Sequence, residues 1–225
     1  MGTDSEIKKT TSEELLGPLN EVERKNAPRF LYVSGDIGLC CNCARVSVIG
    51  TREVSPDGVK RTQDLARMLV ERGVVVVSGL ASGVDTCART IAVIGTPLGS
   101  FYPKENEELQ REIMADHLAI SQFPAGSPAE RKNFAIRNRT MALVSHATVI
   151  VEAGEGSGTL HHGWESLRLG RPLFLLESLV KRADLKWPRE MMGYGAQVLT
   201  RDNIDVLSEY LPQEVPAGEH SALSF

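Results

Sequence analysis

Two stretches of the chain carry residues whose types and spacing suit phosphate binding. The first is EAGEGSGT, in which Gly156, Ser157, Gly158 and Thr159 come just before or at the start of a predicted helix. Glycines let a ligand approach the backbone closely, the two hydroxyls can donate hydrogen bonds, and the amides at a helix start attract an anion. The stretch lacks the Gly-Lys-Ser/Thr of a P-loop and the usual dinucleotide spacing. A tight turn that needs its glycines merely for packing is the alternative interpretation.

The second stretch, ERKNFAIRNR, gathers four cations in a chain whose net charge is −4. Its Lys132, Arg137 and Arg139 lie close in sequence to Phe134 and Asn138. Guanidinium groups bind phosphates, and a base can stack on an aromatic ring, so this combination suits single-stranded nucleic acid. The alternative is a solvated helix face with internal ion pairs.

Metal chemistry is weakly supported. His161 and His162 are adjacent, so on a helix they point roughly 100° apart and cannot hold one metal from one face. Cys40 and Cys43, in the run CCNC, have the gap of half a zinc knuckle, but no second pair stands at matching spacing. We therefore expect no metal and no cofactor, thiols that are buried or half-exposed, and histidines that pack or line the anion site.

No set of residues forms a recognisable catalytic group. Ser157 lies between glycines, but the pattern lacks the spacing of a hydrolase nucleophile elbow. Asp85, Glu152 and Glu165 could act as acids or bases, yet nothing in the sequence pairs them. The sequence therefore predicts a binding protein and not an enzyme.

The composition describes a globular chain with a sizeable core. It has 225 residues, of which 42% are apolar and 24% charged. A net charge of −4 and a pI near 5.8 exclude a protein coated with cations, but they allow a local basic groove. No apolar run approaches the roughly 18 residues of a membrane span, and the polar start does not resemble a signal peptide. We expect a cytoplasmic protein with no membrane contact.

Strands and helices are predicted to alternate along nearly the whole chain, which is typical of a mainly parallel sheet with helices on both faces. We expect a polar N-terminal arm at 1–27, one domain at 28–212 and a flexible tail at 213–225. The apolar strands are predicted at 30–33, 46–50, 74–79, 90–95, 118–123, 147–153 and 171–177.

Two helices bear directly on the site. Ser55 is a suitable N-cap, Pro56 suits the first helical position, and Gly73 can end that helix. The second helix is predicted in FAIRNRTMALVSH, which includes most of the cationic stretch, and its spacing predicts an inward face made of Ile136, Thr140, Leu143 and Val144.

Ligands of such folds bind at the carboxyl ends of the strands. Gly50, Thr51 and Arg52 follow one predicted strand, and Ser82 and Gly83 follow the next. We expect these residues to meet the glycine-rich loop and the cationic helix along one edge of the sheet.

Several motifs together resemble the DNA-processing protein A (DprA/Smf) family. They occur in the family's order between residue 30 and about residue 210, and as a set they are highly specific. The motifs are LYVSGD, VSVIGTRE with SPDG, VVSGLASGVD, TIAVIG, YPKEN, NFAIRNR, and VEAGEGSGTL with GRPLFL.

The resemblance implies an extended Rossmann-like domain that binds single-stranded DNA, forms a homodimer and helps to load the RecA recombinase during natural transformation. It implies no enzymatic activity. Carried over onto this sequence, the DNA-contacting arginines are Arg52, Arg137 and Arg139, with Lys132 and Phe134 as neighbours.

The chain departs from the family pattern in two ways. The family often has further N-terminal helical and C-terminal winged-helix domains, for which this chain has no room. Residues 79–89 are also a shorter connection than a parallel crossover usually needs. Either this connection is unusually trimmed or the sequence lacks a segment here.

A competing resemblance is to the LOG phosphoribohydrolases, which cleave the glycosidic bond of a nucleoside monophosphate. In their loop a proline stands where this chain has Ala153, and the catalytic glutamate stands where it has His162. Glu165 comes one turn too late to replace that glutamate. The sequence therefore disfavours a hydrolase, while a nucleotide sensor that binds without cleavage stays open.

Overall fold

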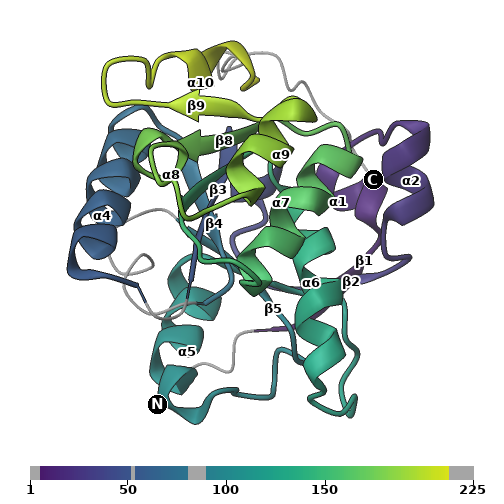
Figure 1. Cartoon of the computed structure of the whole chain (residues 1–225). Helices are drawn as coiled ribbons and strands as arrows, with labels where there is room; N and C mark the ends of the chain where they lie inside the picture. Colours follow the sequence, from purple (N-terminus) through teal and green to yellow (C-terminus); the bar gives the residue numbers. More distant parts are fainter. Residues whose placement is uncertain (1–5, 52–53, 81–89, 213–225) are drawn as a thin grey trace.

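The computed structural model describes residues 6–51, 54–80 and 90–212 (Figure 1). No helix in these ranges is long and apolar enough to cross a membrane. The strands are β1 (Lys8–Thr10), β2 (Leu31–Gly35), β3 (Arg45–Gly50), β4 (Val75–Ser78), β5 (Thr90–Ile94), β6 (Leu118–Ser121), β7 (Ala147–Glu152), β8 (Leu173–Leu176) and β9 (Gln197–Leu199). The helices are α1 (Ser12–Leu16), α2 (Glu21–Asn26), α3 (Gly38–Cys41), α4 (Pro56–Glu71), η1 (Lys104–Asn106), α5 (Glu107–Asp116), α6 (Arg131–Val144), α7 (Gly158–Arg168), α8 (Glu177–Val180), α9 (Trp187–Gly193) and α10 (Val206–Glu209).

The strands form one sheet in the order β1-β2-β6-β5-β4-β3-β7-β8-β9. From β6 to β9 neighbouring strands run parallel, and β1 and β2 add an antiparallel edge. The chain moves outward from β3 through β4 and β5 to β6, and then returns to place β7 beside β3. The carboxyl ends of β3 and β7 are therefore the topological switch point, where ligands bind in such folds. The predicted extended Rossmann-like architecture is confirmed.

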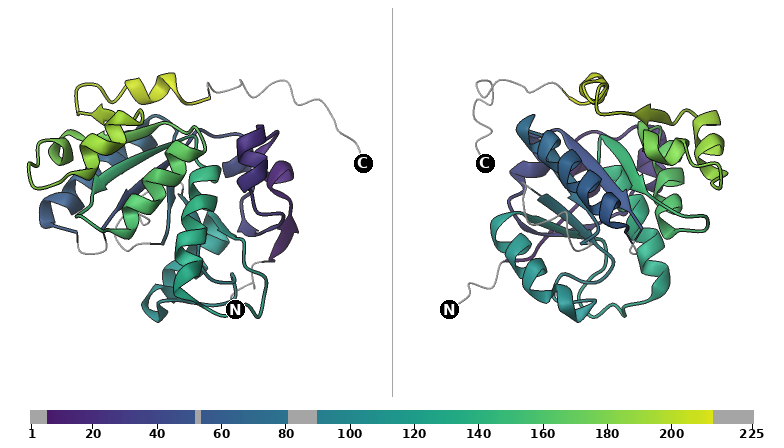
Figure 2. Two further views of the ribbon diagram at one scale, coloured as in Figure 1. Left: turned by 45° about the vertical axis from the view of Figure 1, so that its right-hand side comes forward. Right: turned by 60° about the vertical axis from the view of Figure 1, so that its left-hand side comes forward.

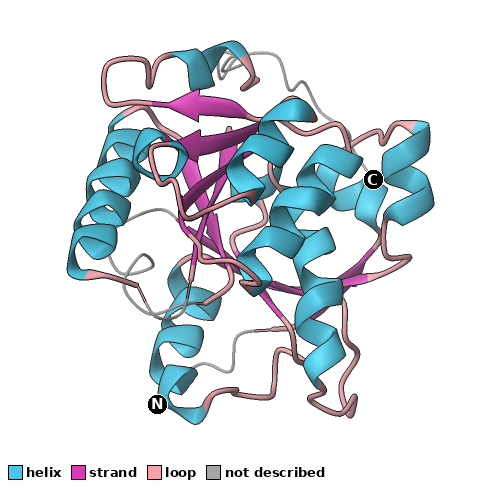
Figure 3. Cartoon of the chain, viewed as in Figure 1, coloured by secondary structure: helices cyan, strands magenta, loops and turns pink. Residues whose placement is uncertain are grey.

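Helices cover both faces of the sheet (Figures 2 and 3). Along β4, Val75 and Val77 point into a core cluster that also contains residues of α6 and α7, whereas Val76 packs in the cluster of α4. This alternation is the two-residue period of a strand that is buried on both faces, and it explains why the strands are almost wholly apolar.

Helix α4 begins as the sequence predicts. Oγ of Ser55 accepts a hydrogen bond of 3.0 Å from the amide of Gly58, and Pro56 occupies the first turn. Gly73 follows the helix with a φ of +71°, a conformation that glycine adopts without strain.

The inward face of α6 differs from the prediction. Phe134, Arg137, Met141 and Val144 face the sheet, with a spacing of three and four residues that defines one helical stripe. Ile136 was predicted on this face, but the residue is 41% exposed, so that prediction is wrong. Phe134 and Arg137 fit against two glycines at the strand ends, and this fit sets the rotation of the helix. It depends on tertiary contacts, which the spacing of residues within the helix does not show.

The segment predicted as a polar arm is partly folded onto the domain. Strand β1 pairs with β2, and the side chains of Leu15 and Leu19 are buried. Thr11 and Asn20 each cap a short helix through a capping box. Residues 8–26 therefore pack on the antiparallel edge and on the ends of α6 and α7. The predicted tail at 213–225 lies outside the described residues.

Candidate nucleic-acid interface

The carboxyl ends of β5, β4, β3 and β7 lie side by side, because these strands are neighbours and parallel. We call this border of the sheet the carboxyl edge. With about 4.8 Å between adjacent strands, the stretch from β5 to β7 measures roughly 14 Å. Helix α6 runs antiparallel to the strands, so its N-terminal turns lie at this same edge (Figure 1).

At the switch point the structure brings together residues from both predicted stretches. The Thr51 amide donates to the Glu152 carbonyl at 2.8 Å, and Oγ1 of Thr159 donates to the Gly50 carbonyl at 2.9 Å. Nδ2 of Asn138 donates to the Gly158 carbonyl at 3.4 Å, which ties α6 to the first turn of α7. Gly50 and Thr51 therefore lie beside the glycine-rich loop, and α6 contacts it through Asn138, as predicted for these residues.

The glycines of the loop before α7 are not required by packing. A Cβ at Gly154, Gly156 or Gly158 would meet no atom within 4 Å. Of these three glycines, only Gly156 has a positive φ, of +73°. Ser157 is the N-cap of α7, and its Oγ accepts from the Thr159 amide at 3.3 Å. The open space around the loop favours close approach of a ligand over the packing alternative.

Arg137 and Phe134 occupy the ends of β4 and β5. Nη1 of Arg137 donates to the Val93 carbonyl at 2.7 Å, and a Cβ at Gly79 would overlap the guanidinium. A Cβ at Gly95 would lie 2.9 Å from the ring of Phe134. Each strand-end glycine thus accommodates one side chain of α6. Because Arg137 also holds these strand ends, Arg137→Glu would change the local structure as well as the charge.

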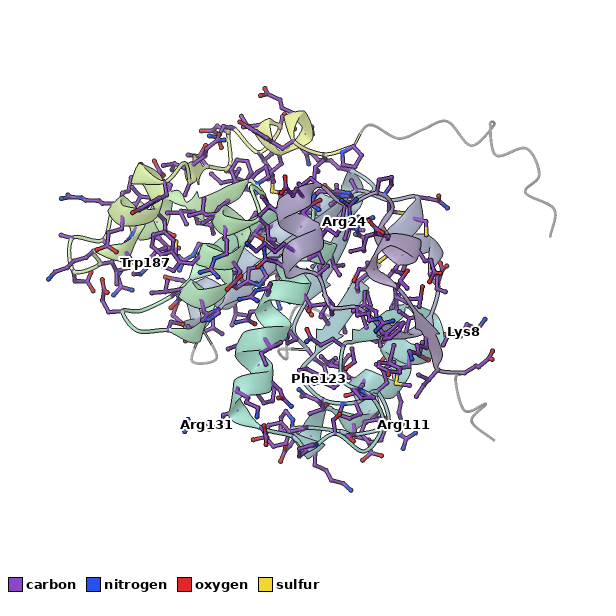
Figure 4. The ribbon with its side chains drawn as sticks, turned by 90° about the vertical axis from the view of Figure 1, so that its right-hand side faces the viewer. Lys8, Arg24, Arg111, Phe123, Arg131 and Trp187 are labelled. Atoms are coloured by element: carbon purple, nitrogen blue, oxygen red, sulfur yellow. The ribbon has the colours of Figure 1, made fainter. Side chains whose placement is uncertain are left out.

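Lys132 extends from the first turn of α6 and is 71% exposed. Its Nζ lies 2.5 Å from Oε2 of Glu130, a surface ion pair that a phosphate could replace at small cost. Figure 4 shows the neighbouring Arg131 at the start of α6, at the outer border of the molecule. The N-terminal turn of α6 therefore presents cations to solvent beside the carboxyl edge.

Arg139 has different surroundings. It lies two residues after Arg137, roughly 200° around the helix, and its Nε and Nη2 donate to the two carboxylate oxygens of Glu165 at 2.8 and 3.2 Å. Burial raises the pKa of Glu165, but its hydrogen bonds with Arg139 and the charges of Arg139 and Arg168 outweigh burial and leave that pKa lowered. Arg139 thus joins α6 to α7, and its predicted DNA contact stays a prediction.

Glu152 has a role that the sequence analysis missed. Its carboxylate accepts from Oγ of Ser55 at 2.8 Å and lies 3.5 Å from Nη2 of Arg61. It also lies so close to Gly58 that a Cβ there would overlap it. The start of α4, where a Rossmann fold binds a phosphate, is therefore occupied by a carboxylate of the protein itself. The only feature of the sequence that could have indicated this contact was Gly58, a glycine in the first turn of a predicted helix.

His162 stands where the loop pattern of the LOG phosphoribohydrolases has its catalytic glutamate, and it is buried. Its Nε2 lies 3.2 Å from Oγ1 of Thr148, and burial, with the charges of Arg137 and His161, lowers its pKa to about 3. A buried neutral imidazole bound to a core threonine is unsuited to act on a substrate. This finding weakens the hydrolase alternative further.

The described residues contain no group of three or more metal-binding side chains. Cys40 is buried, and burial raises the pKa of its thiol to about 12, whereas Cys41 is exposed. The predicted site residues Arg52, Ser82 and Gly83 and the carboxylate Asp85 lie outside the described residues.

The comparison with protein families matches residues 10–212 to the family described as DNA recombination-mediator protein A. Protein Smf of Synechocystis is 35% identical over 167 residues, which are 70% of this chain and 42% of that protein. DNA processing protein DprA of Streptococcus pneumoniae is 33% identical over 202 residues, which are 86% of this chain and 71% of that protein. This chain thus spans less than half of the Synechocystis protein.

A solved structure is similar over nearly the whole chain. DNA processing protein A from Helicobacter pylori, described for its single-stranded DNA binding mode, superposes with a TM-score of 0.76 at 27% identity. The superposition covers 93% of this chain and 100% of that chain. Together with the family match over 10–212, these similarities show that the chain belongs to the DNA recombination-mediator protein A family.

Proposed function

We propose that this chain binds single-stranded DNA along the carboxyl edge. The observation that carries the proposal is the order of side chains there. Phe134 lies at the end of β5, Arg137 between the ends of β5 and β4, and the Gly50–Thr51 and Gly156–Thr159 loops at β3 and β7. An aromatic ring, a guanidinium and open backbone loops in one row suit the base and backbone of a single strand.

The shape of this edge supports a polymer more than a mononucleotide. Glu152 fills the helix start at which a nucleotide phosphate would bind. Two hollows among the described residues, of about 410 and 320 Å³, lie elsewhere, at the amino ends of the parallel strands, the first beside Leu167 and the second beside Met114. A strand that crosses an open edge needs no enclosed pocket. The proposal involves binding and no catalytic step.

Arg52, Ser82 and Gly83 complete the proposed site. They are included from the sequence alone, because they follow β3 and β4 along the chain, and they lie outside the described residues. Lys132 extends the site along α6, and Asn138, Ser157 and Gly158 border the glycine loop. Arg139 stays in the proposed site, but it can contact a phosphate only after its ion pair with Glu165 opens.

Membership of a recombination-mediator family supports a finer proposal. The chain would act in the cytoplasm as a homodimer that passes its bound strand to the RecA recombinase, during natural transformation or related recombination. Two measurements test this part: light scattering of the purified chain for its mass, and RecA filament formation on a strand coated with single-strand-binding protein.

Fluorescence anisotropy of a labelled oligo-dT strand, titrated at two salt concentrations, tests DNA binding directly. We expect binding that weakens steeply as salt rises and that a nucleoside monophosphate does not displace. Absence of binding at low salt would overturn the proposal. Displacement by the mononucleotide would instead identify a nucleotide sensor.

A further inference from the structure

Tyr102 is a large aromatic side chain exposed beside the proposed site. The residue is 54% exposed, and the centroid of its ring lies 5.6 Å from that of Phe134, with the planes tilted by 45°. The inner ring, Phe134, rests against the backbone of Gly95 at the end of β5. The two rings therefore form a pair of which one member is fixed on the sheet and the other faces solvent.

The loop that carries Tyr102 is held in place. Oγ1 of Thr96 donates to the Ser100 carbonyl at 3.1 Å, and Nε2 of the buried Gln110 donates to the Leu98 carbonyl at 2.9 Å. The preceding residue, Phe101, packs its ring under the guanidinium of Arg111, 4.3 Å from the ring centroid. These contacts anchor the segment that leads into Tyr102, so its backbone is held beside the end of β5 before any ligand binds.

The other exposed tyrosine rings are in different chemical surroundings. Tyr194 is 74% exposed and meets the edge of Trp164 with centroids 5.3 Å apart, but it follows α9, away from the carboxyl edge. Tyr210 accepts a hydrogen bond from Gln197 and packs on Phe174. Only Tyr102 of these three combines exposure with contact to a residue of the proposed site.

We propose that Tyr102 stacks on a base of the bound strand, next to the base that stacks on Phe134. This inference rests on the proposed function and adds a base-binding residue that extends the site beyond the end of β5. Stacking on an aromatic ring tolerates any base, because every base has a π face. Tyr102 therefore distinguishes a strand with bases from a bare sugar–phosphate chain, which Lys132 does not.

The test compares wild type, Tyr102→Ala and Tyr102→Phe on two labelled strands of equal length, oligo-dT and an abasic strand. We expect Tyr102→Ala to weaken oligo-dT binding by about 5- to 150-fold, with the salt dependence unchanged. Tyr102→Phe should bind like wild type, because the ring is retained. On the abasic strand all three proteins should bind equally. Tyr194→Ala is the matched control and should not change either affinity.

The outcomes separate this inference from the proposed function. If wild type binds oligo-dT and Tyr102→Ala binds it equally well, the inference is wrong and the proposed function stands. If Tyr102→Ala loses the same affinity on both strands, the residue acts through structure and the inference is again wrong. If wild type does not bind oligo-dT at low salt, the proposed function fails and this inference fails with it.

Discussion

At the scale of single residues, two cations of α6 have different surroundings. The side chain of Lys132 extends into solvent, whereas that of Arg139 is bonded to Glu165 of α7. Lys132→Ala should remove one phosphate contact, lowering affinity for oligo-dT by about 3- to 10-fold at low salt and the salt slope by about 0.7. Lys25→Ala is the control, because Lys25 is exposed on α2, near the opposite end of α6. If the two variants had the same salt slope, Lys132 would not contact the DNA.

Arg139→Gln tests a different property of the same helix. The buried carboxylate of Glu165 would lose both donors, so we expect the free energy of unfolding to fall by about 1–3 kcal/mol in urea titrations at pH 7. The pKa of Glu165 is lowered in the folded state, so this contribution is present above its ordinary value of 4.5 and is lost as pH falls below it. The difference between wild type and variant should therefore shrink in acid. A variant of normal stability that no longer binds DNA would show instead that Arg139 contacts phosphate.

At the scale of elements, the fit between α6 and the strand ends depends on two glycines. Gly95→Ala would place a methyl group 2.9 Å from the ring of Phe134, so the ring and the first turns of α6 must shift. We expect a loss of about 1–3 kcal/mol in stability and weaker binding of oligo-dT. Gly99→Ala is the control, since a Cβ there meets nothing within 4 Å. Unchanged DNA binding in Gly95→Ala would mean that the position of Phe134 does not matter for the site.

At the scale of the whole molecule, two histidines, the half-buried His146 and the buried His162, make stability depend on pH. Burial, with the charges of Arg45 and Arg171, lowers the pKa of His146 to about 3, and burial lowers that of His162 to about 3 as well. Each neutral ring stabilises the fold fully above pH 6.5, and this contribution is lost as pH falls toward 3. Between pH 7.5 and 5.0 the unfolding free energy should fall by about 2 kcal/mol for each histidine. Urea titrations of wild type and His162→Gln measure this, and the variant should lose about half of the pH dependence. The same pH dependence in both proteins would contradict it.

The sequence by itself determined the elements and their general arrangement. Helix α4 begins at Ser55 and Pro56 and ends before Gly73, and these signals depend on contacts within a few residues. Near-continuous apolar runs identify the strands that are buried on both faces. Those signals are local, so they can be read along the chain. The edge at which ligands bind follows from the parallel sheet, and the sequence therefore placed the glycine loop and the cationic helix together correctly.

Only the tertiary structure decided what each side chain of that edge contacts. Arg137 and Arg139 are two residues apart in one cationic stretch, and the rotation of α6 turns one to the strand ends and the other to Glu165. That rotation is set by Gly79 and Gly95, which lie roughly 40 to 60 residues away in the chain. Glu152 likewise fills the start of α4 because β3 and β7 are neighbours. Such contacts depend on strand order and close packing, which no local pattern of residues records.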